Sequence, residues 1–124
     1  MKLIIGGAYQ GKLDYAKKHF DVREAFFCSQ ERAELDFSKE AICGLEQFAL
    51  ACVKSGIEAK DYLREHRQLL EDKVLICTDI SQGIVPIDMQ QRAMREMTGR
   101  ALVYLAQEAE TVVRVFCGLG CRLK

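Results

Sequence analysis

The sequence has few aromatic residues, no tryptophan and no excess of charge of one sign. Aromatic residues make up 8% of the 124 residues, and 18 lysines and arginines balance 18 aspartates and glutamates. Without a basic excess the chain lacks the electrostatic footprint of nucleic-acid binding, so we expect no nucleic-acid partner. The hydrophobic share of 49% is enough for an ordinary core. We therefore expect one folded domain over residues 1–124 rather than disorder.

Long apolar runs and metal-binding cysteine patterns are also missing. Met1–Ile5 is broken at once by Gly6-Gly7 and is too short for a signal-peptide core or a membrane span. We expect no membrane partner and a cytoplasmic location, in which the six cysteines stay reduced. No two cysteines have Cys-x-x-Cys spacing, and no pair of histidines accompanies Cys117 and Cys121. Buried apolar thiols are therefore favoured over a zinc site.

Short apolar runs alternate with amphipathic segments along the chain. The apolar runs predict strands at 3–5, 25–28, 74–78 and 112–117. Helical spacing predicts helices over 12–20, 38–55, 61–70 and 88–109. In the second of these, Ser38 is the expected N-cap and Gly44 lies inside the helix at a cost of about 1 kcal/mol. The segment Glu31–Phe37 is ambiguous, since its alternating part suggests a short third strand.

This alternation of strands and helices predicts an α/β fold. We expect three layers, with a mostly parallel central sheet and helices on both faces. The uninterrupted apolar run Val74–Thr78 is typical of a strand in the middle of such a sheet.

The loop after the first predicted strand fits the phosphate-binding pattern G-x-x-x-x-G-K. Its glycines permit backbone angles closed to other residues, so successive N–H groups can point at one phosphate. The following helix adds the partial positive charge of its N-terminus, and Lys12 adds a full charge. The candidate cofactor-binding residues are Gly6, Gly7, Ala8, Tyr9, Gln10, Gly11, Lys12 and Leu13.

One position departs from the pattern. Leu13 stands where a serine or threonine normally ligates Mg²⁺. Either the loop binds phosphate with metal placement impaired, or the glycines merely form a turn. We favour retained phosphate binding, because a predicted strand precedes the loop and a predicted helix follows it.

A carboxylate after the strand Val74–Thr78 is the second candidate feature. Asp79 is positioned to organise Mg²⁺ through water and so to join Lys12 as a catalytic residue, although it equally suits a cap of the turn leading to Gly83. Asp36 and Glu46 are weaker candidates, since neither clearly ends a central strand. His19 and His66 are interpreted as surface or packing residues, and the arginines of the long helix as a solvated face; these are Arg92, Arg95 and Arg100.

These residues resemble a known family. The opening Gly6–Lys12, with a C-terminal stretch beginning at Thr78-Asp79, is similar to the bifunctional adenosylcobinamide kinase/adenosylcobinamide-phosphate guanylyltransferase of cobalamin biosynthesis. The stretch continues through Gly83-Ile84-Val85-Pro86, Arg92, Arg95-Glu96, Gly99-Arg100, Leu105-Ala106, Val112 and Gly118-Leu119-Gly120 to Lys124. The Gly-Ile-Val-Pro element with its downstream spacing is more specific than the glycine loop alone.

The resemblance implies a RecA-like P-loop fold, ATP or GTP as ligand, Mg²⁺, a corrinoid as partner and association into homo-oligomers. It carries over to Gly6, Gly11 and Lys12 as phosphate-binding residues and to Asp79 as the acidic residue at a strand end. The chain departs from the family at Leu13 and in its shorter middle, which lacks the stretch bearing the guanylylated histidine. Guanylyl transfer is therefore not expected.

Three hypotheses follow, in descending order. The first is a shortened family member that binds a purine nucleotide with little or no transferase activity. The second is a minimal Mg²⁺-dependent kinase acting on adenosylcobinamide or another small alcohol through Lys12 and Asp79. The third is a structural or interaction module that no longer binds nucleotide. Leu13 favours the first over the second, and the intact glycines and lysine favour it over the third.

Overall fold

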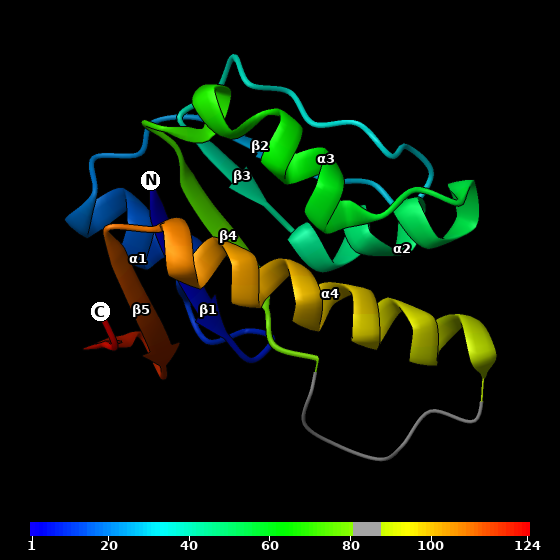
Figure 1. Cartoon of the computed structure of the whole chain (residues 1–124). Coiled ribbons are helices and arrows are strands. Elements are labelled where there is room, and N and C mark those ends of the chain that lie inside the picture. Colours follow the sequence, from blue (N-terminus) through cyan, green and yellow to red (C-terminus); the bar gives the residue numbers. More distant parts are fainter. Residues whose placement is uncertain (81–87) are drawn as a thin grey trace.

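The computed structural model describes residues 1–80 and 88–124 as an α/β fold built on a six-stranded sheet (Figure 1). The strand order is β2-β3-β4-β1-β5-β6. The strands are β1 (Lys2–Gly6), β2 (Ala25–Phe27), β3 (Ala41–Cys43), β4 (Val74–Thr78), β5 (Thr111–Phe116) and β6 (Leu119–Arg122). All pairs are parallel except β5 and β6, which are antiparallel. The expected mostly parallel sheet is confirmed.

The central strands are the ones with continuous apolar runs. β1 lies between β4 and β5, with Leu3 beside Leu75 on one side and beside Val112 on the other. Four of the five residues of β4 are buried. A strand that is covered on both faces and paired on both edges has no place for a polar side chain, which explains its unbroken apolar sequence.

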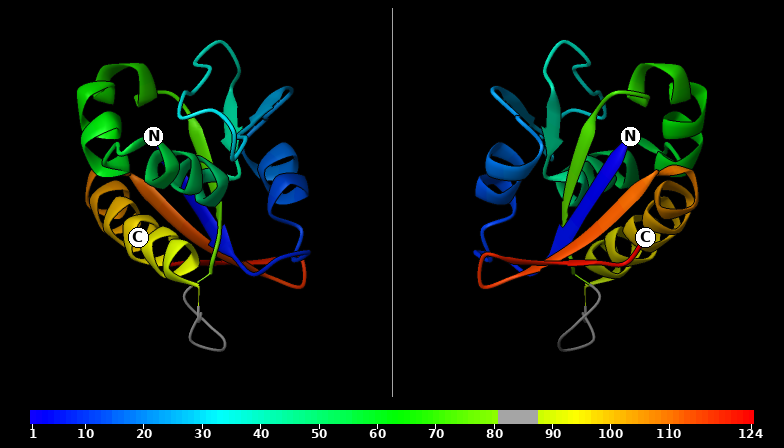
Figure 2. Two further views of the ribbon diagram at one scale, coloured as in Figure 1. Left: turned by 90° about the vertical axis from the view of Figure 1, so that its right-hand side faces the viewer. Right: turned by 90° about the vertical axis from the view of Figure 1, so that its left-hand side faces the viewer.

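Helices cover both faces of the sheet (Figure 2). On one face α1 (Lys12–His19) packs over a cluster that includes Ile4, Ile76 and Val113. On the other face lie α2 (Leu45–Ser55), α3 (Ala59–Glu65) and α4 (Met89–Glu108), over a cluster that includes Leu3, Leu75 and Val112. Successive residues of β1, β3 and β4 thus alternate between the two clusters, as the pleat of a strand requires. The three expected layers are present.

The helix predicted from Ser38 to Ser55 is wrong in its first half. Residues Ala41–Cys43 form β3 instead, and all three are buried between the neighbouring strands β2 and β4. Gly44 is the N-cap of α2 and not an interior residue, with φ of 77°, a conformation that favours glycine. Burial within the sheet outweighs the helical spacing of the apolar residues here.

Two further expectations differ from the structure. The segment Glu31–Phe37 contains no strand, and the third strand of the sequence comes after it. After β5 the chain turns back through Cys117-Gly118 to form β6, which the sequence analysis missed. All four residues of β6 are exposed, so it lacks the alternation of buried and exposed residues by which strands are predicted.

The remaining elements follow the prediction closely. Asp88 accepts a hydrogen bond from the Gln90 amide at 2.7 Å and so caps α4, which runs to Glu108. The helix predicted over 61–70 is divided into α3 and a 3₁₀ turn, Arg67–Leu70. Within the described ranges, no helix is long and apolar enough to cross a bilayer. The Gly83–Pro86 element and the turn assigned to it lie outside the described residues.

Candidate functional site

The glycine loop lies where the central strand meets the first helix. β1 ends at Gly6 and α1 begins at Lys12, so residues 7–11 connect the two, as predicted. Gly6 is required by close approach, because a Cβ at this position would lie 2.5 Å from the carbonyl oxygen of Val115 in β5. A larger residue would push the loop away from the sheet.

The backbone of this loop is bent at two residues with positive φ. Tyr9 has φ of 60° and Gly11, the N-cap of α1, has φ of 84°. Ala8 and Tyr9 form a turn, and within residues 1–80 and 88–124 no group accepts a hydrogen bond from the amides of residues 11–13. A run of unpaired N–H groups at a helix N-terminus is the arrangement that binds anions.

Lys12 spans the loop with its side chain. Its Nζ donates a hydrogen bond of 2.6 Å to the carbonyl oxygen of Gly7, and only 9% of the residue is exposed. The positive charge is therefore held at the loop and not in bulk solvent. An anion seated on the loop amides would lie within reach of this ammonium group.

The hairpin between β5 and β6 supports the loop from one side. The Gln10 carbonyl accepts a hydrogen bond from the Gly118 amide at 2.8 Å, and Gln10 Oε1 accepts one from the Cys117 amide at 2.6 Å. Cys117 and Gly118 have φ of 51° and 77°, which forms the two-residue turn of the hairpin. No sequence pattern predicts this contact, which joins residues more than 100 positions apart.

Leu13 serves packing rather than metal binding. Its side chain is partly buried against the cluster beneath α1, which includes Ile4 and Ala16. Leucine has no hydroxyl, so the position predicted to matter for Mg²⁺ contributes no ligand.

The backbone of Asp79 lies beside the start of the loop. Its amide donates a hydrogen bond of 2.7 Å to the carbonyl oxygen of Gly6, because Gly6 and Thr78 are register partners in the parallel pair β1–β4. The carboxyl ends of both strands therefore meet at the glycine loop. The proposed roles of Asp79 in catalysis and Mg²⁺ binding stay predictions.

Glu46 is closer to the site than the sequence suggested. It lies in the first turn of α2, is 8% exposed, and accepts a hydrogen bond of 2.9 Å from the Thr78 amide through Oε1. Burial, together with the charge of Glu46 and against the opposing charges of Lys17 and Lys12, raises the pKa of the Cys43 thiol to about 11. Glu46 and Lys12 thus act on the same region. Glu46 was underestimated because it comes just after the end of β3, and the sequence had predicted a helix there instead of a strand.

The loop forms one wall of a depression of about 480 Å³. Its other wall consists of strand ends, since Phe27, Cys43 and Thr78 are the last residues of β2, β3 and β4. The complete lining is Tyr9, Gln10, Gly11, Lys12, Leu13, Asp14, Phe27, Cys43, Gly44, Ile76 and Thr78. The depression has the size of a small-molecule site and lies at the carboxyl end of a parallel sheet, where α/β proteins bind ligands.

The weaker acidic candidate and the histidines have structural roles elsewhere. The Ser38 amide donates to Asp36 Oδ1 at 2.8 Å, and hydrogen bonding to Ser38 lowers the pKa of this carboxyl group. The His19 ring lies tilted against the Tyr15 ring, with centroids 4.2 Å apart, and the His66 ring stacks on Tyr62 at the same distance. Both histidines are packing residues, as expected.

Arg100 of the long helix is not simply solvated. Arg100 forms a two-bonded ion pair with Glu58, with Nε–Oε1 and Nη2–Oε2 distances of 3.0 and 3.1 Å. This pair joins α4 to the start of α3, and hydrogen bonding to Arg100 lowers the pKa of Glu58.

The prediction that all cysteines are buried is wrong for two of them. Cys43, Cys52 and Cys77 are buried and Cys28 is partly buried, but Cys117 and Cys121 are exposed. These two belong to the hairpin turn and to β6, the strand that the sequence analysis missed. Among the described residues, no cluster of three or more histidine, cysteine or acidic side chains is arranged to hold a metal ion.

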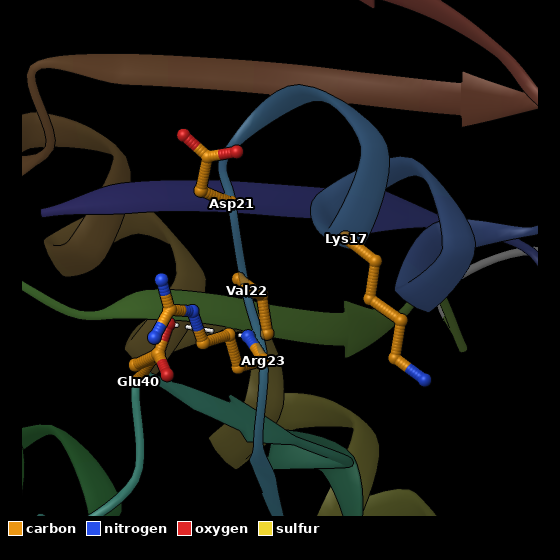
Figure 3. A pocket seen from close by; sticks show the side chains of 5 residues that line it. All are labelled: Lys17, Asp21, Val22, Arg23 and Glu40. Atoms are coloured by element: carbon orange, nitrogen blue, oxygen red, sulfur yellow. Dashed lines mark hydrogen bonds between the residues drawn. The ribbon is translucent and has the colours of Figure 1, made fainter.

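A second depression lies at the amino-terminal ends of β2 and β3 (Figure 3). It measures about 540 Å³ and is lined by Lys17 of α1, by Asp21, Val22 and Arg23 before β2, and by Glu40 before β3. The Arg23 amide donates to Glu40 Oε2 at 3.1 Å, while Lys17 and Asp21 point in different directions (Figure 3). Two charges of each sign leave this surface without a preference for anions or cations.

A scan against protein-family models finds no match for this chain, and a search of curated proteins finds no significant one.

Proposed function

We propose that the chain binds the phosphate groups of a purine nucleotide, ATP or GTP, at the loop Gly6–Leu13. The observation that carries the proposal is that the amides of residues 11–13 have no acceptor among the described residues, with the Lys12 ammonium 2.6 Å from the Gly7 carbonyl oxygen. On binding, a phosphate oxygen replaces this carbonyl as the partner of Lys12, and the loop amides donate to the same group. In this proposal the fold is a RecA-like P-loop domain.

The proposed protein is a nucleotide binder with little or no transferase activity. Leu13 supports this limit, because no hydroxyl stands where Mg²⁺ is normally ligated. The resemblance described above suggests a relation to the adenosylcobinamide kinase/guanylyltransferase family, with a corrinoid as a second ligand. A minimal Mg²⁺-dependent kinase is the alternative, and it is favoured by Glu46 and Asp79, which bring two carboxylates to the ends of β3 and β4.

Thermal melting with and without nucleotide tests phosphate binding. A ligand at 100 times its Kd stabilises the native state by about 2.7 kcal/mol. For a chain of this size, that corresponds to a rise in Tm of roughly 5 to 15 °C. We expect such a rise with millimolar ATP or GTP, and Lys12→Ala should abolish the rise.

Lys18→Ala is the matched control, since Lys18 is exposed on the same helix and outside the depression. This variant should keep the rise in Tm. The proposal fails if the unmodified chain shows no rise with ATP, GTP or their diphosphates. Mg²⁺-dependent release of phosphate to water or to a small alcohol in the same mixtures would instead favour the kinase.

A further inference from the structure

Two exposed aromatic side chains line the same depression as the phosphate loop. Phe27, the last residue of β2, is 64% exposed, and Tyr9 in the loop is fully exposed. Neither ring contributes to the two core clusters of the described residues. Because these two rings are not buried in the core, stabilisation of the fold does not explain why aromatic residues stand at these positions.

The backbone conformation of Tyr9 is unfavourable for an aromatic residue. Its φ of 60° lies in the left-handed region, where a bulky residue is strained and glycine is not. The loop thus holds a large aromatic residue in an unfavourable conformation, with its ring turned to solvent. Such strain is typical of positions retained for ligand contact.

The lining of the depression is chemically mixed. Gly11 and Lys12 of the loop suit phosphate. Phe27, Cys43 and Ile76, from the strands β2, β3 and β4, give the same depression an apolar part of its lining. A ligand that fills the depression therefore carries an anionic group and a flat apolar group on one molecule.

We infer that Phe27 and Tyr9 bind the planar base of the nucleotide whose phosphates occupy the loop. The inference rests on the proposed function and adds to it the place of the base. Aromatic side chains stack on any base through its π-face, which gives affinity without strong selection between adenine and guanine. Both ATP and GTP are therefore accepted.

Calorimetric titration of ATP, GTP and inorganic tripolyphosphate tests the inference. Phe27→Ala should weaken ATP and GTP by roughly 5- to 150-fold and leave tripolyphosphate unchanged, because only the nucleotides carry a base. Phe27→Tyr keeps a ring and should keep the affinity. Tyr9→Gly, which keeps the backbone conformation, should weaken the nucleotides in the same selective way.

Phe116→Ala is the control, since Phe116 is 67% exposed on β5 and does not line the depression. It should change none of the three affinities. The inference is overturned if Phe27→Ala binds ATP as tightly as the parent, or if it loses tripolyphosphate equally. It is also overturned if the parent binds tripolyphosphate as tightly as ATP, in which case phosphate binding survives. A parent that binds none of the three ligands removes the proposed function as well.

Discussion

At Leu13, packing in the core is gained and a ligand for Mg²⁺ is lost. Its side chain packs against the cluster beneath α1 and also lines the depression. The same position at the start of a helix would suit a hydroxyl that ligates Mg²⁺. Packing and metal binding therefore compete at this residue.

Replacement of Leu13 by serine should separate the two effects. We expect Leu13→Ser to lower the free energy of unfolding by about 1–2 kcal/mol, because a partly buried leucine loses its apolar contacts. The rise in Tm caused by ATP should become larger with Mg²⁺ than without it. Thermal melting with and without both ligands measures the two changes.

Leu13→Ala is the matched variant for this experiment. It removes the same packing and offers no hydroxyl, so its Tm should fall without any new response to Mg²⁺. An identical Mg²⁺ response in Leu13→Ser and Leu13→Ala would show that the missing hydroxyl is not what limits metal binding.

At the scale of elements, the loop and the β5–β6 hairpin form one unit. Gln10 bonds to the hairpin through its main chain and its side chain, and a Cβ on Gly11 would lie 3.4 Å from the Gly118 Cα. Further along, Tyr15 of α1 packs closely on Gly120 of β6. The hairpin therefore fixes the loop before any ligand arrives, which reduces the entropy lost on binding.

Gln10→Ala should loosen this unit without breaking it. The side-chain bond to Cys117 is lost and the main-chain bond to Gly118 remains, so the free energy of unfolding should fall by about 0.5–1.5 kcal/mol. Nucleotide affinity should fall too, because a less ordered loop must be ordered on binding. Thermal melting and calorimetric titration measure the two effects.

Gln91→Ala provides the comparison for Gln10→Ala, since Gln91 is exposed on α4 and outside the depression. It should leave both quantities unchanged. If Gln10→Ala bound ATP as tightly as the parent, the bond from Gln10 to the hairpin would not be needed to order the loop for binding.

The elements that were predicted from the sequence have a strong local pattern. β1, β4 and β5 have apolar runs, and α4 has an N-cap at Asp88 with a long polar and apolar repeat. The glycine loop was predicted because its pattern and both flanking elements are local. In each of these segments, neighbouring residues alone determine the structure.

The elements that were missed depend on distant residues. β3 is three residues long and is buried only because β2 and β4 lie on either side of it. β6 is stabilised by pairing with β5, although its own side chains are exposed. At the site, Glu46 and Gln10 were underestimated or missed because their partners Thr78 and Cys117 are 32 and 107 residues away. No local pattern contains such contacts.

At the scale of the whole molecule, the buried cysteines make the free energy of unfolding depend on pH. Cys28, Cys52 and Cys77 line the α2 side of the sheet, and Cys43 faces α1. Burial raises the pKa of Cys28 and Cys52 to about 12 and that of Cys43 to about 11. It also raises the pKa of Cys77 well above its ordinary value. In the unfolded chain the same four thiols titrate in the ordinary range, near 8.5.

The sign of the pH effect follows from this difference. As the pH rises above about 8.5, the unfolded state releases thiol protons that the native state retains, so the unfolded state binds fewer protons and stability falls. Below that pH both states keep these protons, and the contribution of the thiols is constant. We expect the free energy of unfolding, measured by urea denaturation under reducing conditions, to decline between pH 8 and pH 10.

Two single variants separate the effect of a buried thiol on the pH dependence of stability from the effects of the other groups that titrate in this range. Cys52→Ala removes one fully buried thiol, and Cys121→Ser removes one exposed thiol. Lysine and tyrosine side chains are identical in both proteins, so their effects cancel in the comparison. The decline with pH should be shallower in Cys52→Ala than in the parent and unchanged in Cys121→Ser. Equal slopes in all three proteins would mean that the core thiols ionise as readily when folded as when unfolded, which burial at this depth does not permit.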